Sequence, residues 1–220
     1  MKMISITTAL LLFALPAMAE PEQPQIGPGR YEVWLGITSW PGLSELEPLA
    51  AGSFDEVGLG LGGAFHASLK RYEHSEILAG VDMYIGGTSS NVGGIIDDLI
   101  ARDLYLGASL KWGLGKSRAL QLDAGAGYHL LDMAQVSTRI WGLEHQVWES
   151  NRLGTFVGAT WDVWAGQAEK TAGLSIAFKV HFVEFGTVYD EDIFLEPILG
   201  PNAGRIEGPL YLLQVGFSGR

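Results

Sequence analysis

The 220-residue chain contains no cysteine, which excludes a disulfide-stapled scaffold and a thiolate metal site. Charged residues make up only 18% of the sequence, against a usual ~25%. Their balance is acidic, with a net charge of −11, so the chain lacks the basic surface typical of nucleic-acid-binding proteins. With 47% hydrophobic residues it also lacks the composition of a disordered chain. These absences leave a folded protein whose partners do not include nucleic acid.

After residue 19 the chain has no apolar run of the ~20 residues that a membrane-spanning helix needs. Residues 4–15 form a shorter apolar run, which Lys2 precedes and the small-x-small sequence Ala17-Met18-Ala19 follows. We interpret residues 1–19 as a cleaved signal peptide for export, and we expect residues 20–29, with three prolines, to be a flexible mature N-terminus. The mature chain is then either soluble outside the inner membrane or spans a membrane without helices.

Glycine is abundant, with 30 residues, and this argues against a helical fold because each glycine in a helix costs ~1 kcal/mol relative to alanine. Apolar side chains instead recur at every second position, as in Leu104, Leu106, Ala108 and Leu110. Such alternation predicts strands with one apolar face. The eight segments that follow it are residues 31–38, 57–70, 77–86, 104–114, 120–130, 153–164, 174–182 and 211–218.

The connections between these segments alternate between long and short. The long ones are residues 39–54, 87–103, 132–152 and 188–209, and the short ones are residues 71–76, 115–119 and 165–171. This alternation is typical of an all-β, eight-stranded antiparallel up-and-down transmembrane β-barrel with extended outer loops and tight inner turns. Within the second long connection, helical spacing of apolar residues predicts a short helix over residues 91–101.

The second face of each strand decides which side of the barrel is apolar. It carries many glycines, among them Gly58, Gly107 and Gly125, together with four acids and three bases. Small residues and paired charges suit the narrow interior of an eight-stranded barrel, so the apolar face is expected to contact lipid. The predicted lumen network, in which Glu32 pairs with Lys70 and Lys111 with Asp123, consists of Glu32, Lys70, Asp82, Lys111, Asp123, Asp162 and Lys179. It would plug the barrel, for stability alone or as part of a gated ion path.

The alternation, the loop pattern and the last strand, Pro209–Phe217, together resemble the small eight-stranded outer-membrane barrels of Gram-negative bacteria. That group includes the outer-membrane protein A type domain and porin-family barrels. The resemblance covers the architecture of residues 29–217, and we expect the barrel to occupy residues 30–218. It implies an outer-membrane location, contacts with lipid and lipopolysaccharide, and insertion by the barrel-assembly machinery. The last strand looks like the C-terminal insertion signal read by that machinery, although Ser218-Gly219-Arg220 follow the terminal aromatic residue.

Acidic residues gather in the long loops, where they attract cations or basic ligands or only keep the loops solvated. Trp141 and Trp148, in the third long loop, are candidate contacts for an extracellular ligand. His129 and His181 would join the lumen network or line a metal or pH-sensitive site with Asp82 or Glu184. No sequence motif implies a cofactor.

His66 and Ser68 are the catalytic candidates, because a His-x-Ser strand pair also occurs in the eight-stranded lipid A deacylases. Nucleophilic catalysis also needs a carboxylate that orients the histidine, and residues 78–80, where that family places it, are apolar. We therefore expect a non-enzymatic barrel of a structural, adhesion or porin-like kind. The alternatives are a lipid A-modifying barrel enzyme and a soluble lipocalin-like binder.

Overall fold

The computed structural model describes residues 29–43, 46, 52–54, 56–92, 97–137, 143–163, 172–188 and 204–219. The predicted signal peptide, residues 1–19, and nearly all of the predicted N-terminal segment lie outside the described residues. Among the described residues, no helix is long and apolar enough to cross a membrane.

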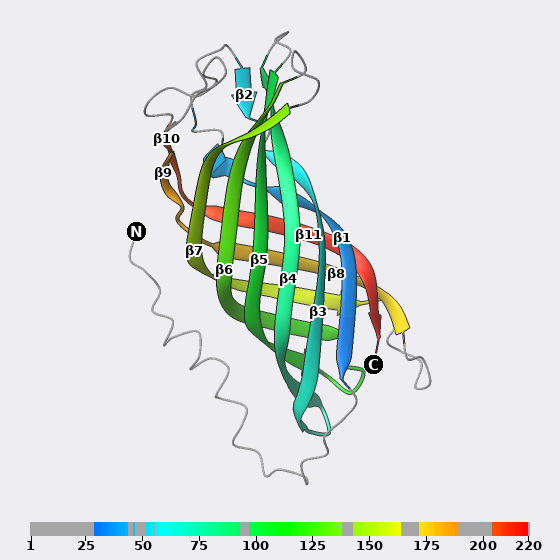
Figure 1. Cartoon of the computed structure of the whole chain (residues 1–220). Helices are drawn as coiled ribbons and strands as arrows, with labels where there is room; N and C mark the ends of the chain where they lie inside the picture. The colour runs from blue at the N-terminus through cyan, green and yellow to red at the C-terminus, as the bar shows by residue number, and fades with distance from the viewer. Residues whose placement is uncertain are drawn as a thin grey trace.

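Eight antiparallel strands form a closed barrel, as predicted (Figure 1). Each strand pairs with its neighbour in sequence, and the first pairs with the last. The barrel strands are β1 (Arg30–Ser39), β3 (Val57–Arg71), β4 (Ser75–Val92), β5 (Asp97–Leu114), β6 (Leu120–Ser137), β7 (Leu143–Asp162), β8 (Ala172–Phe182) and β11 (Pro209–Gly219). The turns between β3 and β4 and between β5 and β6 lie at one end of the barrel, together with the start of β1 and the last residues of β11.

The strands are staggered around the barrel. Following paired residues from Trp34 through β3, β4, β5 and β6 leads to Arg152 on β7, while following them through β11 and β8 leads to Asp162. The difference, 162 − 152, is a stagger of ten residues. Such a stagger tilts the strands relative to the barrel axis. Residues far apart along the chain therefore face each other at the same height inside the barrel.

Large apolar side chains cover the outside of all eight strands. Leu35, Leu59 and Phe217 are 68%, 77% and 65% exposed, for example, while the residues beside them in sequence point inward. On β5 the outward-facing positions carry no charge from Leu104 to Leu114, a length that suits the ~9–11 residues of a tilted membrane strand. Toward the long connections this apolar surface ends at Arg102, which pairs with Asp132 on the next strand at 2.5 Å.

Beyond that boundary β4, β5, β6 and β7 continue as a taller wall than β1, β8 and β11 (Figure 1). Residues 87–103 and 132–152, predicted as long loops, therefore lie largely in strands. The predicted helix over residues 91–101 is wrong for its described part, since residues 91–92 belong to β4 and residues 97–101 to β5. The hydrophobic pattern inverts here, with Leu131 and Met133 buried on the inner face and Asp132 facing out.

Glycines on the inner face make room for large side chains. A Cβ atom on Gly62 would lie 2.5 Å from Trp34 Nε1, and one on Gly216 would lie 2.7 Å from Trp34 Cβ. Gly154 and Gly158 stand against His129 and Lys179 in the same way, at 2.8 Å. The glycine excess thus reflects an interior filled by aromatic, histidine and lysine side chains.

Candidate functional site

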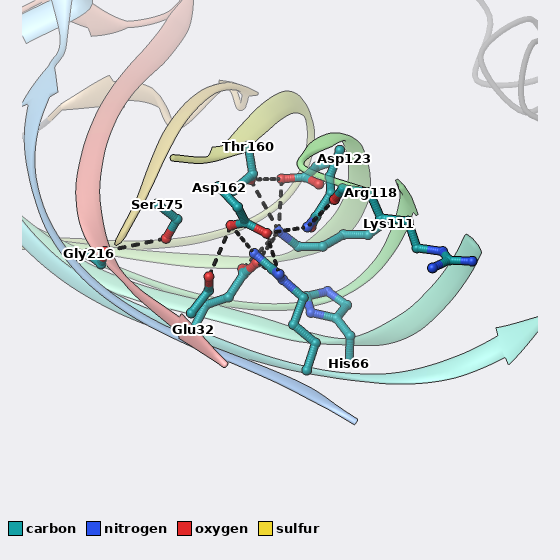
Figure 2. Close-up of polar contacts among 12 residues, drawn as sticks. Glu32, His66, Lys111, Arg118, Asp123, Thr160, Asp162, Ser175 and Gly216 are labelled. Carbon is teal, nitrogen blue, oxygen red and sulfur yellow. Dashed lines mark hydrogen bonds and ion pairs between the residues drawn. The ribbon is translucent and has the colours of Figure 1, made fainter. Parts of the chain in front are cut away.

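A charge cluster fills the half of the lumen near the short turns. Lys111 Nζ lies 2.8 Å from the Glu32 carboxylate and 3.2 Å from that of Asp123. Thr160 Oγ1 donates to Asp123 at 2.9 Å, and Arg30 Nε donates to Glu32 at 2.5 Å. These side chains come from β1, β5, β6 and β7 and converge across the barrel (Figure 2). Because each buried charge has an opposite partner, the cluster avoids the large cost of an isolated buried ion.

Asp162, on β7, joins this cluster to the strands that close the barrel. Its carboxylate accepts two hydrogen bonds from the Arg30 guanidinium, both at 2.7 Å. It also accepts from Ser218 at 3.0 Å and from Gln121 at 3.1 Å. Arg30 belongs to β1 and Ser218 to β11, so a single carboxylate holds both sides of the seam between the first and last strands.

A second buried ion pair lies above the cluster. Lys179 donates to Asp82 across the lumen, and its ammonium group stands 4.6 Å from the centre of the Trp34 ring and 5.1 Å from that of Phe156. Lys111 approaches the same Trp34 ring at 5.7 Å. A cation over an aromatic face is stabilised by the ring quadrupole, so Trp34 helps to stabilise both buried ammonium groups.

Nearest the short turns, Glu76 forms the floor of the lumen. It is fully buried and accepts hydrogen bonds from Ser68 at 2.8 Å and from Arg71 at 2.9 Å. Arg118 Nε lies 3.9 Å from the same carboxylate, and its Nη2 donates to the carbonyl of Tyr72 at 2.9 Å. Arg118 has a positive φ of 51° in the turn between β5 and β6. The guanidinium groups of Arg71 and Arg118 thus lie beside the buried Glu76 carboxylate at this end of the lumen.

Toward the long connections the lumen is filled by an aromatic and histidine cluster. His129 Nδ1 lies 2.8 Å from Asp103, whose carboxylate also accepts a hydrogen bond from Tyr84. His129 Nε2 lies 3.2 Å from His181 Nδ1. Tyr105 packs against both imidazoles, with ring centres 4.7 and 4.8 Å away. Both histidines are fully buried. Arg152 of β7 pairs with His129 in the sheet, but Arg152 is exposed.

Segments from the long connections fold over this cluster and form an apolar cap. The cap consists of the short 3-10 helix η2 (Pro41–Leu43) with its neighbours Trp40 and Leu46, residues 183–185, and the hairpin of β9 (Gly186–Val188) with β10 (Gly204–Ile206). Trp40 meets Phe185 edge to face, with ring centres 5.7 Å apart, and Phe185 N donates to the Ile206 carbonyl at 3.1 Å. The cap residues pack on Leu131 and Met133 of the taller wall.

The structure brings six of the seven predicted network residues into these buried contacts. Lys70 is the exception, and its predicted pairing with Glu32 is wrong. Glu32 lies opposite Ala64, and the register of β3 against β4 shifts between Ser68 and Lys70. The extra residue turns Lys70 away from the lumen, where it is partly exposed over the Tyr72 ring, and points Arg71 inward instead.

The two catalytic candidates are buried in the lumen and have different hydrogen-bond partners. His66 Nε2 lies 2.7 Å from Ser109 Oγ, while Ser68 donates to Glu76. An activated serine would need the imidazole as its hydrogen-bond partner. The contacts instead tie each side chain to a different neighbour.

The loop predictions are only partly covered by the structure. Trp141 lies outside the described residues, as do most of the acidic loop residues. Trp148 is part of β7 rather than of a loop, pairs with Met133 on β6 and packs against the cap. Its predicted place in a loop is therefore wrong, because β6 and β7 extend beyond the barrel mouth.

The sequence reasoning missed several residues of the lumen. The predicted first strand begins at Tyr31 and omits Arg30, which follows the same alternation two residues before Glu32. Asp103 falls in a predicted loop. The alternation places Tyr84, Tyr105 and His129 on the inner face, and the strand pairing of the structure brings them to the same height. The expected partner of the histidines was Asp82 or Glu184, whereas Asp103 takes that place.

Chemically, these contacts pair charges and fill space. Among the described residues, no group of three or more histidine or acidic side chains is arranged to hold a metal ion. The buried acids and bases are drawn together across the barrel from strands that are distant in sequence, so each contact fastens opposite walls.

No protein-family model matches the chain, and no curated protein matches it by sequence. Among solved structures, the chain is similar to Neisserial surface protein A, with a TM-score of 0.45 and 9% identity over 89% of this chain and 98% of that one. It is similar to Ail, the attachment invasion locus protein of Yersinia pestis, with a TM-score of 0.47 and 9% identity over 87% of this chain and 99% of that one. It is also similar to the outer membrane protein OprG from Pseudomonas aeruginosa, with a TM-score of 0.47 and 11% identity over 91% and 98%. The closed eight-stranded barrel itself is established by the strand pairing of this chain.

Proposed function

We propose that this protein is a non-enzymatic, integral outer-membrane β-barrel with a filled lumen, whose long connections face the outside. The observation that carries the proposal is the inverted polarity of the barrel. Large apolar side chains are exposed on all eight strands, while charged side chains level with this apolar surface, such as Glu32, Lys111 and Lys179, are buried inside. Lipid is the solvent that favours such a surface, and a closed barrel leaves it no unpaired strand edge.

The interior supports a structural or adhesion role rather than a conducting one. The charge cluster, the aromatic and histidine cluster and the cap follow one another along the lumen, and the apolar cap residues Leu43, Phe185 and Ile206 are buried. An ion would have to displace paired carboxylates and guanidinium groups, and each broken pair would leave a buried charge. Binding of partners then falls to the long connections.

Both alternatives fit the geometry less well. A soluble lipocalin-like binder would keep its apolar side chains inside and its charges in water, which is the reverse of the polarity here. A lipid A-modifying enzyme would present its nucleophile toward lipid, whereas His66 and Ser68 are 0% and 3% exposed inside the barrel.

Membrane placement is tested by fractionation and by migration on a detergent gel. We expect the mature chain in the outer-membrane fraction, and we expect the unboiled sample to migrate as a compact species that shifts on boiling. Recovery of the chain in the soluble periplasmic fraction without detergent would refute the lipid-facing assignment.

The filled lumen is tested separately in planar lipid bilayers. The reconstituted barrel should give no steady openings, with a general diffusion porin measured in parallel as the positive control. Steady, large conductance steps from the purified barrel would overturn the plugged lumen while leaving the membrane assignment intact.

A further inference from the structure

The contact between His129 and His181 sits directly under the cap. His129 packs edge to face on Phe185, with ring centres 6.1 Å apart. His181 ends the inward-facing residues of β8, and the chain enters the cap immediately afterwards at Val183 and Phe185, which are buried. Both imidazoles are therefore coupled to one cap segment, His129 by packing and His181 by chain continuity.

The geometry admits one proton between the two rings. His129 Nε2 and His181 Nδ1 are 3.2 Å apart, so one nitrogen donates and the other accepts. The other nitrogen of His129 lies against Asp103. Two further protons, one on each ring, would put two N–H groups face to face and two positive charges side by side in a buried site. The contact then changes from attraction to repulsion.

Against these two charges, the described surroundings offer one carboxylate, that of Asp103. Tyr84 from β4, Asp103 and Tyr105 from β5, and Lys179 from β8 are the titratable groups that face the pair. Asp103 already accepts from Tyr84 and lies on the far side of His129. Phe156 from β7 stacks on His181 at 4.9 Å, and the described cap and β11 residues nearby are apolar. His181 Nε2 is buried with no hydrogen-bond partner among the described residues.

We propose that the His129–His181 contact is an acid-sensitive latch that holds the cap closed at neutral pH and releases it in acid. The inference rests on the proposed outer-membrane placement, in which the cap faces the external medium. Imidazole is the side chain that gains charge between about pH 5 and 8. When the cap is open, His181 is hydrated and can take up a proton that the buried ring cannot hold without a partner for Nε2, so acid favours opening. Each pH unit in the range where this proton is bound in the open state alone shifts the ratio of open to closed by up to about tenfold.

The absence of cysteine allows a direct test, because one introduced thiol is the only one in the chain. Leu43→Cys places a thiol in the cap at a position with 0% exposure, and Glu207→Cys places a reference thiol at an exposed position nearby. Labelling by 4,4′-dithiodipyridine is measured on the folded barrel in lipid vesicles from pH 7.5 to 4.5. The ratio of the two rates removes the intrinsic effect of pH on the reagent.

We expect this ratio to rise at least tenfold between pH 7.5 and 4.5, and to stay near its neutral value when His181→Gln is added. Glutamine keeps a hydrogen-bonding side chain but does not gain a proton. His66→Gln, which alters a lumen histidine in contact with Ser109 and outside the cap, should retain the acid response. A flat ratio in the parent, or an equal rise with His181→Gln, would overturn the latch.

Two further measurements keep the outcome decisive. Migration of unboiled samples shows at each pH whether the barrel itself stays folded, so loss of the barrel is not mistaken for opening of the cap. If Leu43→Cys does not fold, amide hydrogen exchange of residues 183–188 in the unsubstituted chain replaces labelling, and unchanged exchange in acid counts against the latch. A barrel absent from the outer membrane would instead refute the proposed function, whichever way the labelling turned out.

Discussion

At the scale of single residues, Lys111 shows how the lumen distributes its charge. One ammonium group serves two buried carboxylates, Glu32 and Asp123, and also approaches the Trp34 ring. Removing the cation would leave two acids close together without their shared partner. Breaking a buried pair in this way is far more damaging than losing a solvent-exposed one.

Lys111→Met should therefore lower the free energy of unfolding by about 3–5 kcal/mol. The same substitution at Lys70, which is partly exposed over Tyr72, should change it by no more than about 1 kcal/mol. Urea titration in lipid vesicles, followed by gel migration, measures both. Equal effects at the two sites would contradict the buried role of Lys111.

Also at the scale of single residues, the neighbouring glycines Gly62 and Gly63 on β3 lie on opposite faces of the strand. Gly62→Ala should destabilise the barrel by about 1–3 kcal/mol, because its Cβ would stand 2.5 Å from Trp34 Nε1 and 2.8 Å from the Met83 carbonyl. Gly63→Ala meets only the Glu32 carbonyl, at 3.1 Å, and should cost less. The same urea titration ranks the two variants, and a larger loss at Gly63 would argue against the packing around Trp34.

At the scale of elements, the strands were predictable only where lipid fixes their pattern. Between Leu120 and Leu130 on β6, every outward position is apolar and the inward ones are polar or glycine, so period two is clear. At Leu131 the pattern inverts, because the cap now covers the inner face and water the outer one. Leu130 and Leu131 in succession break the alternation, so the sequence pattern predicts a loop where the structure has the taller wall.

The sequence predicts which residues belong to the candidate site better than it predicts which of them contact each other. Alternation indicates which side chains point inward, but not which meet. Those contacts depend on the ten-residue stagger of the strands, which brings Glu32 of β1 to Lys111 of β5. They also depend on the register shift after Ser68, which turns Lys70 away from the lumen. Neither feature leaves a mark in the residue pattern of a single strand.

The boundary of the apolar surface gives a prediction for the strands as membrane elements. Val81→Arg, at an outward position of β4 within the apolar surface, should cost about 2–4 kcal/mol in a bilayer. Asn151→Arg, at an exposed position of β7 that pairs with Leu130 at the edge of that surface, should cost about 0–1 kcal/mol. Unfolding free energies in vesicles compare the two. Equal costs would mean that the bilayer does not end where Arg102 and Asp132 begin.

At the scale of the whole molecule, the barrel is closed by the pairing of its first and last strands, which are the most distant in sequence. Interior contacts from the opposite wall reinforce that seam. Asp162 on β7 holds Arg30 of β1 through two hydrogen bonds and Ser218 of β11 through a third. The seam therefore depends on a residue that belongs to neither of its strands.

Asp162→Asn should weaken closure of the barrel although it preserves the shape of the side chain. The neutral amide leaves the buried Arg30 with Glu32 alone, and loss of such a partner costs about 3–5 kcal/mol. The expected result is a folded species that converts to the unfolded one at a lower temperature, read as the temperature at which gel migration shifts. Asp132→Asn removes an acid of the same kind from an exterior pair with Arg102, and it serves as the control because a partly exposed pair contributes at most about 1 kcal/mol. If both variants shifted at the same temperature as the parent, the seam would be held by its backbone pairing alone, and Asp162 would have no part in closure.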